Sequence, residues 1–88
     1  MINSKSSPVS WVLLIDELDE AKEHLESLIT DMAGAGEMDE DEFAIYLGHV
    51  YAHLNRAWNG RYSSLDLVLS DEQRDSFSQF PIDIKPMG

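Results

Sequence analysis

The sequence predicts an all-α fold, in which an antiparallel helical hairpin carries a short third helix and an extended C-terminal tail. Two long segments repeat apolar residues at alternating spacings of three and four, as a helix with one buried side does. Glycines separate these segments, and a capping box precedes the short third segment. Residues 1–88 form a single small domain, and a chain this short has a marginal core. It contains no cysteine, so disulfides cannot supplement that core. We therefore expect two hairpins to pair as a homodimeric four-helix bundle.

The first helix is predicted over residues 10–33, after a flexible arm of residues 1–8. Pro8 or Ser10 begins this helix, and the Ser10 side chain has an oxygen suited to capping. Its apolar stripe consists of Trp11, Leu14, Leu18, Ala21, Leu25, Leu28 and Met32. The opposite side carries carboxylates, so the helix is amphipathic, with one side buried and one side in solvent.

The second helix is predicted over residues 39–59. Residues 33–36 contain two glycines that end the first helix, since glycine adopts the left-handed conformation common at helix ends. Asp39 is the expected cap, and the acids after it favour the positive end of the helix dipole. The stripe that faces the first helix consists of Phe43, Leu47, Val50, Leu54 and Ala57. The short connection favours an antiparallel hairpin.

The third helix is predicted over residues 70–79. Ser70 and Gln73 form a capping box, with the serine at the cap and the glutamine three residues later. Pro81 ends this helix. Residues 80–88 form an extended tail in which Ile82 and Ile84 share one side.

The outward side of the second helix lacks charge, because residues 43–55 include no Asp, Glu, Lys or Arg. The residues on this side are apolar, small or neutral, and a helix that is apolar nearly all round is buried nearly all round. We predict that this side is the dimer interface. Its residues are Ile45, Gly48, His49, Ala52 and Asn55. Two alternatives remain open: the third helix and the tail lie across this side, or a different protein covers it.

The net charge of −11 lies entirely in residues 16–42. This surface excludes direct binding of nucleic acid or of an anionic membrane, because phosphate binding relies on Lys and Arg. It favours a basic protein partner. No targeting segment is visible and the apolar run at residues 11–15 is too short to span a bilayer, so we expect a cytoplasmic protein.

The function indicated is protein interaction or regulation, without enzymatic activity. No phosphate-binding loop, nucleophile elbow or Ser-His-Asp order is found, so no catalytic residue is assigned. An alternative is an acidic inhibitor that mimics nucleic acid and blocks a basic partner. The aromatic residues around the arginines suit a binding hot spot or, alternatively, a small aromatic core. The candidate partner-binding residues are Asp19, Glu20, Glu23, Glu26, Arg56 and Arg61.

Two of the three histidines, His49 and His53, lie on adjacent turns of the second helix, a spacing that can chelate a metal. In an antiparallel hairpin His24 lies level with them, so that His24, His53 and a carboxylate such as Glu17 or Glu20 converge. No acid lies between the two helix-borne histidines and no cysteine is present. We therefore expect structural histidines that bond to carboxylates, with no metal and no cofactor.

The acidic run has a repeated spacing, Glu17-x-x-Glu20, Glu20-x-x-Glu23 and Glu23-x-x-Glu26. It resembles the first half of the magnesium site in all-α nucleotide pyrophosphohydrolases of the MazG type. The resemblance implies Mg²⁺ held against substrate phosphates, with further acids from a second helix. It gives a second alternative function, a metal-dependent nucleotide hydrolase-like protein. Here the second helix has acids only at residues 39–42, so a solvated helix face is the preferred interpretation.

Overall fold

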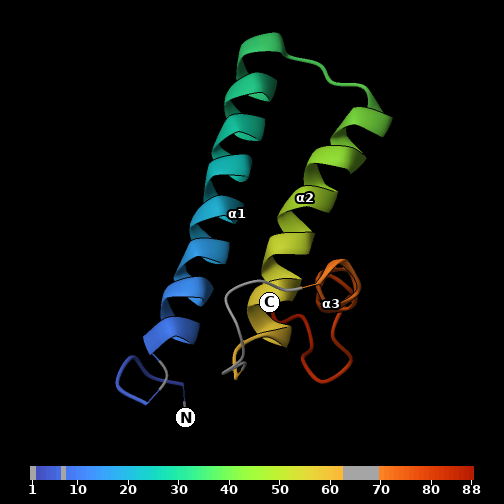
Figure 1. Ribbon diagram of the computed structural model, residues 1–88. Coiled ribbons are helices and arrows are strands. Elements are labelled where there is room, and N and C mark those ends of the chain that lie inside the picture. The colour runs from blue at the N-terminus through green and yellow to red at the C-terminus, as the bar shows by residue number, and fades with distance from the viewer. Residues whose placement is uncertain (1, 7, 63–69) are drawn as a thin grey trace.

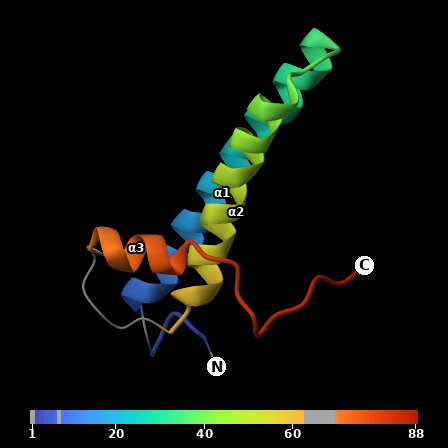
Figure 2. The same ribbon diagram turned by 90° about the vertical axis from the view of Figure 1, so that its right-hand side faces the viewer.

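The computed structural model describes residues 2–6, 8–62 and 70–88. Those ranges contain three helices, α1 (Pro8–Ala35), α2 (Glu40–Asn59) and α3 (Asp71–Phe77), and no strand. α1 and α2 lie side by side and antiparallel, and α3 lies against α2 at the end remote from the hairpin turn (Figures 1 and 2). The predicted all-α class with two packed helices is confirmed. Residues 1 and 7 of the predicted arm lie outside the described residues, as does the segment 63–69.

The first helix is longer than predicted at both ends. It begins at Pro8, where proline loses no helical hydrogen bond. Ser10 lies inside the first turn and is buried, so the prediction that it caps the helix is wrong. At the other end, Gly36 has φ 73° and its amide donates to Met32 O at 2.9 Å. Glycine is thus the helix stop, as the sequence indicates.

The predicted caps of α2 and α3 are both confirmed. The Asp39 carboxylate accepts a hydrogen bond from the Glu42 amide at 3.3 Å. In α3, Ser70 Oγ accepts from the Gln73 amide at 3.2 Å, and the Gln73 side chain accepts from the Ser70 amide at 3.0 Å. α3 ends at Phe77, two residues earlier than predicted, and residues 80–88 have no helix or strand.

The core between the two long helices is small. Its buried apolar residues are Ala21, Leu28, Val50 and Ala57. Three other members of the predicted stripe on α1 remain open: Leu18, Leu25 and Met32 are each about two-fifths exposed or more. A single hairpin covers only one line of each helix, so the remaining apolar line needs a second layer to bury it.

Candidate functional site

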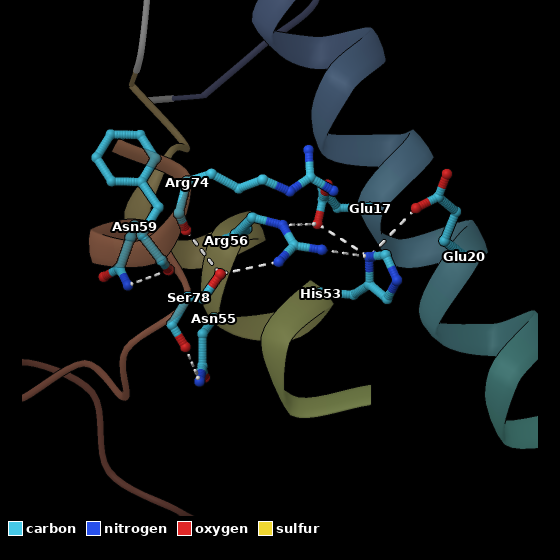
Figure 3. A network of polar contacts seen from close by, with 9 residues as sticks. Glu17, Glu20, His53, Asn55, Arg56, Asn59, Arg74 and Ser78 are labelled. Carbon is cyan, nitrogen blue, oxygen red and sulfur yellow. Dashed lines mark hydrogen bonds and ion pairs between the residues drawn. The ribbon is translucent and has the colours of Figure 1, made fainter. Parts of the chain in front are cut away.

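A polar network joins the three helices on one side of the hairpin (Figure 3). Glu17 and Glu20 lie one turn apart on α1, and His53 and Arg56 lie one turn apart on α2, so each pair shares a helix side. His53 is buried, with 6% of its surface exposed. Its Nδ1 is 3.2 Å from Glu17 Oε2 and 3.3 Å from Glu20 Oε2. Of the convergence that the sequence indicates, the part that joins His53 to the carboxylates is present, whereas His24 is not among the converging ligand atoms.

Arg56 connects this cluster to the segment after α3. Its Nε donates to Glu17 Oε2 at 3.0 Å and its Nη1 donates to Ser78 Oγ at 2.8 Å. Its Nη2 lies 2.9 Å from His53 Nδ1. Only 9% of the Arg56 side chain is exposed. Arg56 is thus engaged inside the chain, although the sequence suggested it as a partner-binding residue.

The three histidine rings form a stack beside the carboxylates. The His24 ring lies 5.1 Å from the His53 ring and 5.5 Å from the His49 ring, and the interplanar angles are 21° and 20°. His24 and His49 are exposed and His53 is buried beneath them. The stack marks the same side of both long helices, which we call the polar side of the hairpin.

Two asparagines of α2 hold the end of α3. Asn55 Nδ2 donates to Ser78 O at 2.8 Å. Asn59 Nδ2 donates to Phe77 O at 2.7 Å and to Gln79 O at 2.9 Å. The last carbonyls of a helix have no partner within the helix. Asn59 satisfies the carbonyl of Phe77, and the other two hydrogen bonds hold the residues just after α3. The sequence signal for this contact is the spacing of the two asparagines, which are one turn apart; the sequence instead predicts Asn55 in the dimer interface.

The predicted dimer interface is divided by this contact. Asn55 is buried against the segment after α3, and Ala52 is half-buried. Ile45, Gly48 and His49 are exposed. The end of this face nearest α3 is therefore covered within the chain, as in the alternative in which the third helix lies across it. The other end is not covered by any described residue of the same chain.

A second cluster anchors the tail. The Arg61 guanidinium lies 3.7 Å from the centre of the Trp58 ring, and the Trp58 indole donates to Asp83 Oδ1 at 2.8 Å. Arg61 Nη2 is 3.5 Å from Asp83 Oδ2. The indole hydrogen bond, with help from Arg61, holds the pKa of the Asp83 carboxyl below its ordinary value. No pattern in the sequence indicated this role for Asp83.

The remaining carboxylates of α1 point to solvent. Asp19, Glu23 and Glu26 are exposed. The one base nearby, Lys22, approaches Glu26 only to 3.9 Å, and both side chains are largely exposed. Such a pair is weak. Glu20 differs from its neighbours because it contacts His53, so the acidic face predicted from the sequence carries one fewer free carboxylate.

Comparisons with protein-family models, with curated proteins and with solved structures found no match for this chain. None of the helices within the described ranges combines the length and apolar character needed to cross a bilayer.

Proposed function

We propose that this chain is a non-enzymatic interaction protein that works as a homodimer, with two hairpins packed as a four-helix bundle. The observation that supports this proposal is an exposed apolar strip on the hairpin. Leu18, Leu25 and Ile29 of α1 and Leu54 of α2 are between 41% and 59% exposed. Exposed apolar side chains that recur along one side of a helix pair are typical of a protein interface.

These residues lie opposite the polar side. Glu17 and His24 of α1 belong to the polar side. Leu18 directly follows Glu17 in the sequence, and Leu25 directly follows His24. Successive residues of a helix point about 100° apart. The line of α1 that packs on α2 lies between these two directions, so the leucines emerge on the far side. We call this the apolar side of the hairpin.

α2 contributes to the same side by the same geometry. Leu54 follows His53, which points into the polar network. Because the two helices are antiparallel neighbours, the directions opposite the histidines coincide. A half-exposed leucine gains about 1 kcal/mol when it is buried. A second copy would bury both strips at once, which supplies the layer that the small core lacks.

In such a bundle the acids of α1 remain on the outside. Asp19, Glu23 and Glu26 would then line the surface of the dimer, where charge complementarity favours a basic protein partner. This part of the proposal rests on the exposure of those carboxylates.

The mass of the protein in solution tests the proposal. At tens of micromolar, a rough working range for homodimers, light scattering should give about twice the 10.0 kDa of one chain. Leu25→Glu places an unpaired charge in the proposed interface and should give a folded monomer. Ile45→Glu, on the face predicted from the sequence, is the matched control and should remain dimeric. A monomeric wild type would refute dimerisation. Loss of the dimer only in Ile45→Glu would move the interface to the outward side of α2.

A further inference from the structure

The polar side contains ligand atoms that converge on one point. His53 Nδ1, one oxygen of Glu17 and one oxygen of Glu20 all lie within 4.8 Å of one another. The nitrogen is 3.2 Å from the Glu17 oxygen and 3.3 Å from the Glu20 oxygen. Two ligands bound at about 2.0–2.1 Å to a tetrahedral ion lie about 3.3–3.4 Å apart. The spacing from the nitrogen to each oxygen therefore fits tetrahedral coordination.

The contacts at His53 Nδ1 cannot all be favourable at once. A ring nitrogen either carries a proton or accepts one. If it accepts from Arg56 Nη2, which is 2.9 Å away, its lone pair also faces the oxygens of Glu17 and Glu20. If it carries a proton, its N–H faces the guanidinium N–H. A cation bound by the nitrogen and both oxygens removes the conflict, because all three atoms then donate electron pairs.

We infer that Glu17, Glu20 and His53 form a binding site for one divalent transition-metal ion, and that the Arg56 guanidinium occupies part of this site when no ion is bound. On binding, the ion replaces Arg56 at Nδ1 and at the Glu17 oxygen, and Arg56 keeps its bond to Ser78 Oγ. Imidazole with carboxylates suits Zn²⁺, whereas Mg²⁺ and Ca²⁺ prefer oxygen ligands alone. The Glu20 side chain is 55% exposed, so the fourth position opens to solvent and can hold water.

This inference departs from the expectation of no metal, because His53 converges with two carboxylates and no second histidine is needed. His49 and His53 share a helix, but the His49 ring stacks on His24 and is not among the converging ligand atoms. The two acids come from α1, one turn apart and opposite His53. The site lies on the polar side, away from the proposed dimer interface, so the inference does not depend on dimerisation.

Calorimetric titration of the full-length, tag-free and metal-stripped protein tests the site. Zn²⁺ should bind with one ion per chain, and Mg²⁺ under the same conditions should not compete. Glu20→Gln should weaken Zn²⁺ binding at least about tenfold, since changes even outside the direct ligands have that effect. Glu20 does not contact Arg56, so this variant should fold. Glu23→Gln, one turn along the same acidic face, is the matched control and should bind as wild type does. Absent Zn²⁺ binding, or equal affinity in the two variants, would overturn the inference.

Thermal unfolding tests the competition with Arg56. Zn²⁺ should raise the melting temperature of Arg56→Gln by more than that of wild type, because no guanidinium has to be displaced. If Arg56→Gln does not fold alone, Zn²⁺ should restore its helical circular dichroism. A shift no larger than that of wild type, or a variant that Zn²⁺ does not restore, would overturn the displacement of Arg56.

Discussion

Replacement of Arg56 by leucine should destabilise the fold more than any other single change on the polar side. The side chain is 9% exposed and bridges Glu17 of α1 to Ser78 beyond α3. Removal of one partner from a buried ion pair costs about 3–5 kcal/mol, since the other charge stays behind unpaired. The Glu17 side chain retains 22% exposure, and solvent screening reduces the expected loss to about 2–4 kcal/mol. For a chain of this size, that is a fall of about 10–30 °C in melting temperature.

The measurement is thermal and urea unfolding by circular dichroism, at equal protein concentrations and with chelator present, so that neither association nor metal differs between samples. Arg56→Lys keeps the charge but loses the planar fork, so it should lie between wild type and Arg56→Leu. Lys22→Met removes an exposed ion pair of 3.9 Å and should change stability by no more than about 0.5 kcal/mol. If Arg56→Leu unfolds at the same midpoint as Lys22→Met, the network does not hold the three helices together.

Three further predictions concern single groups. Glu23→Gln should leave the melting temperature unchanged or raise it slightly at low salt, because it relieves a repulsion of about 0.3 kcal/mol between carboxylates along α1. A clear fall in melting temperature would show that Glu23 has an unrecognised partner. Ser70→Ala should cost about 0.5–2 kcal/mol of local stability in α3, seen as faster amide exchange there; unchanged exchange would argue against the capping box. The Asp83 carboxyl has a lowered pKa, so its bond to Trp58 is present at neutral pH and lost as pH falls through that value, below 3.8. In a Trp11→Phe background, Trp58 fluorescence should therefore change only in acid, and Asp83→Asn should abolish that transition; a transition retained in Asp83→Asn would contradict the assignment.

The local signals in the sequence were sufficient for the helix boundaries, to within a few residues. A cap depends on residues at most three positions apart, as with Asp39 for α2 and Ser70 with Gln73 for α3. A glycine stop depends on one backbone conformation, which Gly36 adopts. Such signals are read directly because no distant residue takes part in them.

The site depended on contacts between distant residues, and the sequence specified these only in part. The antiparallel register of the hairpin was enough to bring His53 level with Glu17 and Glu20. It was not enough to place Arg56, whose partners lie 39 residues before it and 22 residues after it. The apolar period likewise identifies residues that gain from burial, but it does not say what buries them, and Leu18 and Leu25 stay exposed within one chain.

The missing charge in residues 43–55 follows in part from the neighbours of α2. Val50 is buried against α1, the Tyr51 ring packs edge-on against Phe80 at 5.1 Å, and Asn55 donates to Ser78 O. A lysine or glutamate at Val50 or Asn55 would bury an unpaired charge. Packing within the chain does not account for the open end of this face. Ile45 is 62% exposed there. A Cβ added at Gly48 would have no atom within 4 Å. Contacts within the chain give no reason for the lack of charge at that end. The light-scattering measurement of Ile45→Glu therefore tests whether a second copy covers it.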